Sequence, residues 1–183
     1  MMEKTLILPS NDWSDISPGD KVNLTGKLYV GRDQVHRILT EELKKGTLPP
    51  FSFEGNAIYY MGPSPARKGC AIGSAGPTTS RRMDPFSPYL LSKGLKIMVG
   101  KGPRGEEVVR AIKDFGGLYL QAFGGCGALY SSRILSSRIV AYPFLGPEAL
   151  LELEVKDFPT VCIIDSRGDV YSPRDLMRDT ISS

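Results

Sequence analysis

One loop of this chain combines small residues, hydroxyl groups and cations in a way that suits anion binding. Residues 72–84 read IGSAGPTTSRRMD. The small residues allow the backbone to approach a ligand closely, and two threonines supply hydroxyls. A helix is predicted to begin near Thr79 or Ser80, where free N–H groups favour an anion. Arg82 would lie on its first turn, where a guanidinium can clamp a carboxylate through two hydrogen bonds. The alternative is a tight strand-to-helix turn in which Thr79 or Ser80 caps the helix.

A second loop places a lysine between two glycines, after a predicted strand. Residues 99–105 read VGKGPRG. The loop resembles a phosphate loop only in its residue types, because the full G-x-x-x-x-G-K-[ST] pattern is absent. Lys101 is therefore either a well-placed point charge or a solvated lysine in a turn.

The third loop, residues 31–36, reads GRDQVH and joins a predicted strand to a predicted helix. Arg32 could bind a ligand or simply lie on the surface, and Asp33 could cap the helix. His36 is the only histidine in the chain. Alone, one turn into a helix, it is more typical of a packing residue than of a catalyst, and it receives no role.

The three loops together suggest a site for a small dicarboxylate. Each lies where a strand ends and a helix begins, the usual place for ligands in an open α/β sheet. Each brings a fixed cation: Arg32, Arg82 and Lys101. The sequence contains no obvious metal-ligand set, no nucleophile paired with a base and no carboxylate pair. A site that binds an acid without the means to activate it should be half of a larger one.

Composition limits the class of protein. The chain has 183 residues, 41% of them apolar and 23% charged, which is typical of a globular domain. No apolar run reaches the roughly 20 residues that cross a bilayer. The apolar stretch at the start of the chain is too short for a signal peptide. We therefore expect a cytoplasmic protein. A net charge of +3 does not by itself indicate nucleic acid. Three scattered cysteines show no metal-ligand spacing, and Cys162, within a predicted strand, is expected to be inert packing.

The predicted elements alternate strands with short helices, which indicates one α/β domain over residues 1–183. The early strands suggest a second, more barrel-like layer. Phe115 is expected to point inward from its helix, and the tail Arg178–Ser183 to fray. The predicted strands are 5–8, 21–30, 57–61, 96–99, 118–123, 139–142 and 161–165. The predicted helices are 33–45, 105–115, 126–134 and 147–153, besides the one near Thr79.

These loops carry a resemblance to a known family. Residues 73–84 are similar to the signature of the β region of class I fumarases and L-tartrate dehydratases. Shorter segments of the same family resemble residues 59–66 (YYMGPSPA), 31–36, 100–102 (GKG) and 157–159 (DFP). The resemblance is strongest over residues 19–168, and the order of its motifs makes it specific.

The resemblance implies a swivelling β/β/α fold for a region that is a separate chain in some organisms. Its partner α subunit is expected to carry three cysteines that hold a [4Fe–4S] cluster, whose open iron acts as a Lewis acid. The implied reaction is the reversible hydration of fumarate to L-malate, a step of the tricarboxylic acid cycle, by a heterodimer. This chain would close the site, bind no cluster itself, and have no membrane or nucleic acid as partner.

The family's motifs also imply roles for single residues. Thr78 resembles the proposed catalytic threonine, Arg82 and Arg32 resemble carboxylate-binding arginines, and Lys101 matches the lysine near the substrate. Thr79 is expected mainly to cap the helix that follows. Arg81 departs from the usual small residue, so either arginine of the pair could face the ligand, and the spacing from Thr78 favours Arg82.

Two alternatives remain at this stage. An L-tartrate dehydratase β subunit fits equally well, because both substrates are four-carbon dicarboxylates. A non-catalytic module of the same fold, which binds anions or serves assembly, is the alternative from another class. A self-sufficient enzyme is disfavoured by the lack of cluster ligands.

Overall fold

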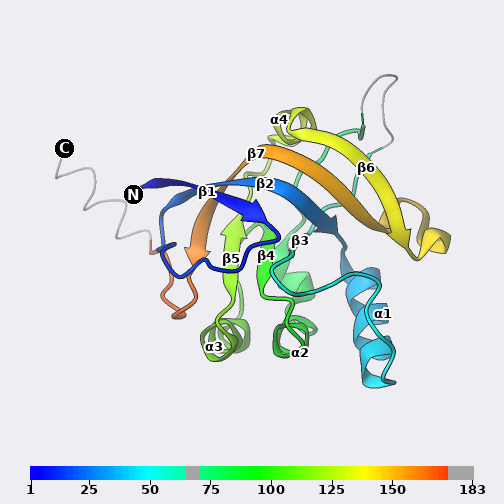
Figure 1. The fold of residues 1–183 in the computed structure, drawn as a ribbon, viewed down its shortest axis with the longest axis horizontal. Coiled ribbons are helices and arrows are strands. Elements are labelled where there is room, and N and C mark those ends of the chain that lie inside the picture. Colours follow the sequence, from blue (N-terminus) through cyan, green and yellow to red (C-terminus); the bar gives the residue numbers. More distant parts are fainter. Residues whose placement is uncertain (65–70, 173–183) are drawn as a thin grey trace.

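The computed structural model describes residues 1–64 and 71–172 (Figure 1). In chain order its elements are β1 (Glu3–Leu8), β2 (Lys21–Val30), α1 (Asp33–Lys44), β3 (Ala57–Tyr59), the 3₁₀ turn η1 (Ser80–Met83), α2 (Ser87–Ser92), β4 (Ile97–Gly100), α3 (Glu106–Phe115), β5 (Leu118–Gln121), α4 (Gly127–Ser132), β6 (Ile134–Ala141), the 3₁₀ segment η2 (Pro143–Glu148) and β7 (Leu150–Ile164). No helix within these two ranges is long and apolar enough to cross a membrane.

Five strands close into a barrel. β2, β3, β4 and β5 are parallel neighbours in that order. β7 runs antiparallel and pairs with β5 on one edge and with β2 on the other, so the sheet closes on itself. β1 adds a parallel strand beside the first part of β2, and β6 pairs with the first part of β7. The predicted α/β class is confirmed as a mixed α/β domain with a closed, barrel-like five-strand sheet.

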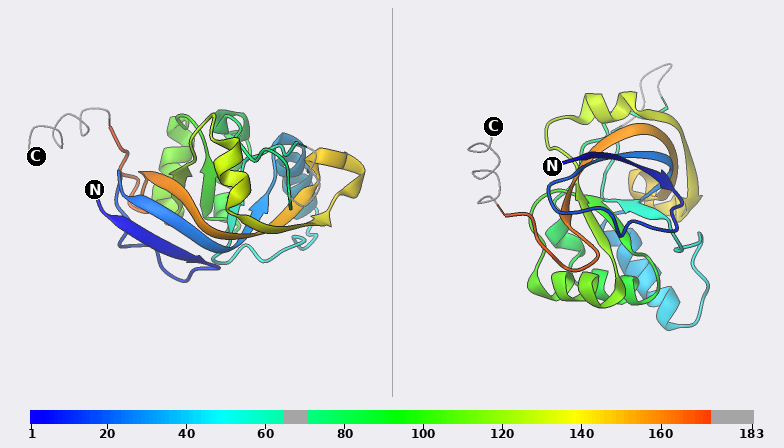
Figure 2. Two further views of the ribbon diagram at one scale, coloured as in Figure 1. Left: turned by 90° about the horizontal axis from the view of Figure 1, so that it is seen from above. Right: turned by 60° about the vertical axis from the view of Figure 1, so that its left-hand side comes forward.

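The barrel strands bury side chains on both faces. One face fills the barrel interior, and the other packs against α1, α2 and α3, which lie together on one side of the sheet (Figures 1 and 2). All four residues of β4 are buried, which explains its unbroken apolar sequence. Interior side chains include those of Leu24, Tyr59, Leu120 and Phe158, and the helix-facing layer includes those of Ile58, Tyr60, Met98 and Tyr119.

The largest error of prediction concerns the end of the chain. Residues 147–153 were expected to form a helix and residues 161–165 a short final strand. Instead η2 ends at Glu148, and β7 runs for 15 residues from Leu150 to Ile164. The start of β7 pairs with β2 on one edge and with β6 on the other, so tertiary pairing overrides the helix propensity of leucine and glutamate. The strand predicted at 139–142 is likewise only the end of β6.

The other predicted boundaries differ less from those in the structure. β1, β2, α1 and α3 are confirmed within about two residues. Phe115 is 39% exposed rather than inward, because it ends α3 just before the left-handed C-cap Gly116. The helix expected near Thr79 is only the turn η1, and helical structure resumes at Ser87. The helix predicted over 126–134 ends at Ser132, since Ile134 already pairs with β7. The tail Arg178–Ser183 lies outside the described residues.

Candidate active site

Three strand ends meet at one edge of the barrel, and two predicted site residues follow them. β2, β3 and β4 are parallel, and their register aligns Val30 with Tyr59 and Tyr59 with Val99. Arg32 comes two residues after β2, and Lys101 comes directly after β4. Parallel pairing therefore brings to one edge two cations that are distant in the sequence.

The threonine loop crosses this edge between β3 and β4. Pro77 forms a bridge with Met61, and the Thr78 N–H donates to the Tyr60 carbonyl at 2.7 Å. Two residues later, the Ser80 N–H donates to the Lys101 carbonyl at 2.9 Å. Thr78 is half-buried, and no hydrogen bond joins its hydroxyl to any other described residue. The Thr78 backbone is thus held at the strand ends, while its hydroxyl is not bonded to another described residue.

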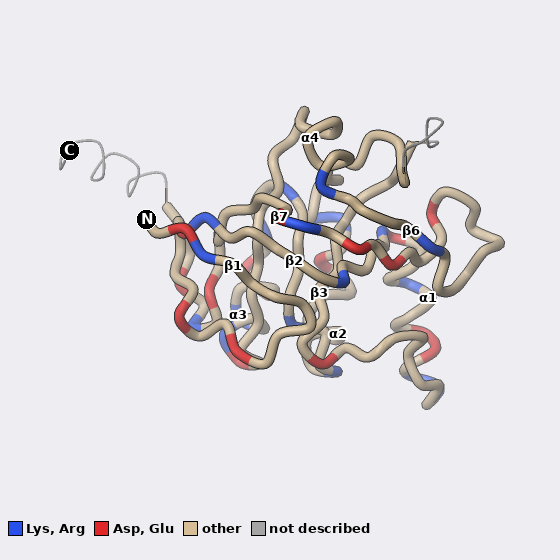
Figure 3. The backbone as a smooth tube through the Cα atoms, turned by 45° about the horizontal axis from the view of Figure 1, so that its top comes forward, with Lys and Arg blue, Asp and Glu red and all other residues tan. Residues whose placement is uncertain are grey.

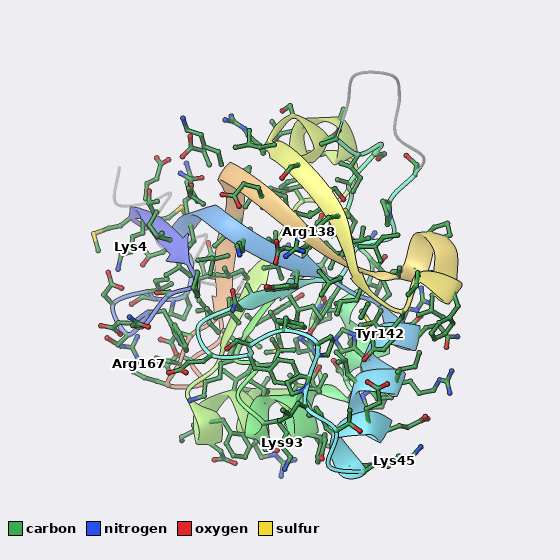
Figure 4. The ribbon with its side chains drawn as sticks, turned by 45° about the vertical axis from the view of Figure 1, so that its right-hand side comes forward. Lys4, Lys45, Lys93, Arg138, Tyr142 and Arg167 are labelled. Carbon is green, nitrogen blue, oxygen red and sulfur yellow. The ribbon has the colours of Figure 1, made fainter. Side chains whose placement is uncertain are left out.

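Arg32 lies across the end of β3. A Cβ atom on Gly62 would come within 2.5 Å of the Arg32 Cζ, so a glycine is needed for the guanidinium to lie there. Arg32 forms an ion pair with Glu148 of η2, and its buried Nε has no partner among the described residues. η2 is itself held to α1, because the Tyr142 hydroxyl donates to Glu42 Oε2 at 2.6 Å (Figure 4).

The structure separates the two arginines of the motif. Arg82 forms an ion pair with Asp33, the first residue of α1 and the neighbour of Arg32. Arg81 lines a different hollow beside Glu106, Glu107 and other residues at the start of α3. Arg82 is therefore paired with the residue next to Arg32, whereas Arg81 is not. That Arg82 is the arginine facing a ligand stays a prediction.

Lys101 is half-buried at the end of β4. Its Cδ and Nζ lie 3.7 and 3.9 Å from the position of a Cβ on Gly124, so the side chain passes over the loop that follows β5. Within residues 1–64 and 71–172 it forms no ion pair.

Thr79 pairs with Lys101 through the backbone and stands at the N-cap of η1, but its side chain makes no capping hydrogen bond. The expected capping role of Thr79 is wrong, because η1 is a short 3₁₀ turn tied to β4 by its backbone.

A buried arginine that sequence reasoning missed supports both loops. The Arg104 side chain is fully buried, and its Nε lies 2.7 Å from Asp84 Oδ1. Its Nη2 donates to the Ser87 hydroxyl at 2.6 Å, and the guanidinium lies 5.4 and 5.0 Å from the ring centroids of Tyr60 and Tyr119. Burial lowers the pKa of Arg104, but the neighbouring tyrosines and Asp84 outweigh it, so the net shift is upward.

Tyr119 extends this buried layer to the backbone. Its hydroxyl donates to the Gly102 carbonyl at 2.7 Å and lies 2.9 Å from the Ser80 hydroxyl. A Cβ on Gly100 would lie only 2.0 Å from that Ser80 oxygen, so the threonine loop packs directly on the end of β4. The only sequence signal was that Asp84 ends its motif and Arg104 is the second-last residue of the other.

His36 belongs to the same layer and not to the site. It is buried, its Nδ1 lies 2.8 Å from the Arg32 carbonyl, and its ring packs edge-on to Tyr60 at 5.1 Å. Burial lowers the pKa of His36 to about 4, with a further lowering from the charge of Arg104. The imidazole is therefore neutral at neutral pH and packs as expected.

The described residues do not fit an iron–sulfur cluster. They contain no group of three histidine, cysteine or acidic side chains placed to hold a metal. Cys162 is buried in β7, where burial raises the pKa of its thiol to about 12, and Cys126 is half-buried next to α4. Cys70 lies outside the described residues. The prediction that Cys162 is a packing residue agrees with its burial.

The arrangement can bind a small anion and offer it a hydroxyl. Arg32, Arg82 and Lys101 come from three different loops, and Thr78 stands between two of the strand ends. Acidic and basic residues are otherwise interspersed along the chain (Figure 3). At this edge, too, Arg32 and Arg82 are paired with acids, and only Lys101 has no ion-pair partner among the described residues.

A closed five-strand sheet, with the threonine loop packed across the ends of β3 and β4, is the class of domain that the structure defines. The chain belongs to the family described as "Fumarase C-terminus", whose model matches residues 6–173. The resemblance that the motifs indicated is therefore confirmed.

The individual relatives include proteins much longer than this chain and one of similar length. "Fumarate hydratase class I, aerobic" of Escherichia coli strain K12 is 40% identical over 153 residues, which are 82% of this chain and 28% of that protein. "Fumarate hydratase 2" of Leishmania major is 39% identical over 157 residues, 84% of this chain and 28% of that protein. The "Putative L(+)-tartrate dehydratase subunit beta" of Methanocaldococcus jannaschii is 35% identical over 170 residues, 88% of this chain and 86% of that protein. This chain therefore corresponds to a part of the fumarate hydratases and to most of the β subunit.

Proposed function

We propose that this chain is the β subunit of a two-subunit iron–sulfur hydro-lyase that interconverts fumarate and L-malate in the cytoplasm. The convergence of Arg32, Arg82, Lys101 and Thr78 at one strand edge, in a chain of this family, carries the proposal. We further propose the swivelling β/β/α type for the fold.

The cations would bind the two carboxylates of the substrate. Arg32 and Arg82 are paired with Glu148 and Asp33, but all four side chains are partly exposed, from 24% to 54%. Exposed ion pairs stabilise a protein by only about 0–1 kcal/mol. A substrate carboxylate can therefore join or replace these acids, since a guanidinium has five N–H donors. Lys101 would add a charge without a fixed direction.

Thr78 would move the proton. Its hydroxyl makes no hydrogen bond with the described residues and lies between the ends of β3 and β4. A threonine hydroxyl is a poor base at neutral pH, so it needs a strongly perturbed setting. We propose that the α subunit completes that setting when it covers the edge.

The same α subunit would hold the [4Fe–4S] cluster. No described part of this chain offers ligands for one, and a relative of which it covers 86% is named as a subunit. The roles proposed for the residues of this chain are limited to binding the acid, excluding water and handling a proton.

An L-tartrate dehydratase is the second candidate, favoured by the 86% coverage of the relative with that name. A non-catalytic anion-binding or assembly module of the same fold is the third. The test is anaerobic co-expression of this chain with its genomic α partner, followed by assays with fumarate, L-malate and L-tartrate. Turnover of fumarate and L-malate alone supports the proposal, and turnover of L-tartrate alone establishes the second candidate. A stable, cluster-loaded complex that converts none of the three would leave only the third.

The isolated chain supplies a control. It should show neither activity nor a cluster spectrum after anaerobic reconstitution with iron and sulfide. A stoichiometric [4Fe–4S] spectrum from the chain alone would contradict the two-subunit proposal.

A further inference from the structure

Asp33 is the acidic residue that joins the two arginine loops. It follows Arg32 directly and begins α1, while its ion-pair partner Arg82 lies in η1, 49 positions further along the chain. The helix fixes the backbone of Asp33, whereas Arg82 is 54% exposed and stands on a short 3₁₀ turn. The ion pair therefore acts as a tether: Asp33, fixed on the helix, restrains the long and exposed side chain of Arg82.

The orientation of the Asp33 carboxylate determines which of its oxygens can bind Arg82. Asp33 Oδ2 pairs with Arg82 Nη2, while Oδ1 is buried and has no hydrogen-bond partner among the described residues. Buried acceptors without a partner are rare in folded proteins. With one oxygen turned inward, only the other can face Arg82. The remaining guanidinium donors, Nη1 and Nε, are left for another acceptor.

We propose that Asp33 is a positioning residue that holds the Arg82 guanidinium next to Arg32, so that the two arginines form a preassembled carboxylate clamp. This inference rests on the proposed function, because it needs Arg82 to bind the substrate. An untethered arginine loses more rotamer freedom when it binds, and prior ordering of a side chain improves affinity. Asp33 thus acts through Arg82 and need not touch the substrate.

Another ion pair of the same helix provides a matched control. Arg37 and Glu41 are paired at 3.4 Å on α1, with both side chains 53% exposed, and Arg37 also donates to Gln34 Oε1 of the same helix at 2.9 Å. Neither side chain forms an ion pair with Arg32, Arg82 or Lys101 in the described chain. Asp33→Asn and Glu41→Gln each remove one acid from an exposed pair of α1. Asp33 also lies in the first turn of α1, so the readouts are KM and the mobility of Arg82, which a purely structural role would not change.

The first experiment measures kinetics on the assembled enzyme. Asp33→Asn should raise KM for L-malate about tenfold, the effect of losing one charge-assisted contact, with kcat changed less than about twofold. Glu41→Gln should change neither, and Asp33→Glu should restore part of the affinity. In an Arg82→Lys background, Asp33→Asn should have no further effect, because its action passes through Arg82. An unchanged or lowered KM in Asp33→Asn, or a full effect in that background, overturns the inference.

The second experiment does not depend on activity. In the full 183-residue chain, ¹⁵N relaxation of the Arg82 Nε–Hε group reports how firmly the guanidinium is held. Asp33→Asn should make this group clearly more mobile, while Glu41→Gln leaves it unchanged. Equal mobility in the wild type and Asp33→Asn overturns the tether even if the enzyme is active. An inactive wild-type complex with a tethered Arg82 would instead contradict the proposed function alone.

Discussion

The candidate site consists of an exposed edge that rests on a buried layer, and each contains an arginine–aspartate pair. At the edge, Arg82 and Asp33 have side chains that are 54% and 30% exposed. In the layer below, Arg104 and Asp84 are 0% and 17% exposed. Water can replace the first pair but not the second. The Arg82–Asp33 pair at the edge is thus open to exchange with a ligand. The Arg104–Asp84 pair in the layer below instead fixes the loops.

The largest expected effect belongs to the edge and concerns rate. Thr78→Ala should lower kcat of the assembled enzyme by about 10²- to 10⁴-fold, the usual contribution of a general acid or base. Thr78→Ser keeps the hydroxyl and should retain much of the activity. Both variants should fold and assemble normally, because the Thr78 hydroxyl has no partner in the described chain. Turnover and melting temperature should be measured together. Near wild-type turnover in Thr78→Ala would place the base in the partner.

The next effect belongs to the layer and concerns stability. Arg104→Met should lower the free energy of unfolding by about 3–5 kcal/mol, as when one partner of a buried ion pair is removed. Urea denaturation of the isolated chain measures it. Arg138→Met is the control, because Arg138 forms an ion pair with Glu152 at 2.9 Å but is 66% exposed on β6 (Figure 4). That variant should change stability by less than about 1 kcal/mol. Similar losses in the two variants would remove the distinction between edge and layer.

The layer should also be sensitive to acid through His36. Its pKa is about 4 in the folded chain and 6.5 ordinarily, so the unfolded state takes up the proton first as pH falls. Stability is fully present above pH 6.5 and is lost progressively between pH 6.5 and 4. The loss approaches roughly 3 kcal/mol at 1.36 kcal/mol per pKa unit. Urea denaturation across this range should show the slope, and His36→Gln should flatten it. An equal slope in that variant would assign the loss to other groups.

The smallest effect is expected at Thr79, at the edge. As a helix cap its hydroxyl would stabilise the chain by about 1 kcal/mol. Since it makes no capping bond, Thr79→Ala should change the free energy of unfolding by less than about 0.5 kcal/mol. Thermal melting tests this, with Ser80→Ala as the comparison, because the Ser80 hydroxyl is buried against Tyr119. A loss of 1 kcal/mol or more for Thr79→Ala would restore the capping interpretation.

Sequence reasoning predicted the edge better than the layer. Arg32, Thr78 and Lys101 stand in loops whose residue types already suggest chemistry, and parallel strands bring such loops together. Arg104 could not be predicted, because its role depends on Asp84, Tyr60 and Tyr119, which meet it only in the folded chain. The pairing of Asp33 with Arg82 depends in the same way on where η1 meets α1. An isolated motif shows which residues could react, but not which acids already face them.

The strands show the same limit. β2 was predicted over its full length because its alternation is local. β7 was divided into a helix and a short strand, because nothing near Leu150–Leu153 shows that β2 and β6 will lie on either side. Asp157, with a positive φ of 50°, and Pro159 further interrupt the pattern of a strand.

The closure of the barrel by β7 also sets the order in which the chain can fold. β7 pairs Val161 with Lys21 and Leu151 with Val30, residues more than a hundred positions apart. Such distant pairs require large loops to close before any contact stabilises them, which slows folding. During synthesis, β2 and β5 must wait with unpaired edges until β7 has left the ribosome, and open edges invite wrong pairing. Completion of the barrel therefore depends on the last of its five strands to be made.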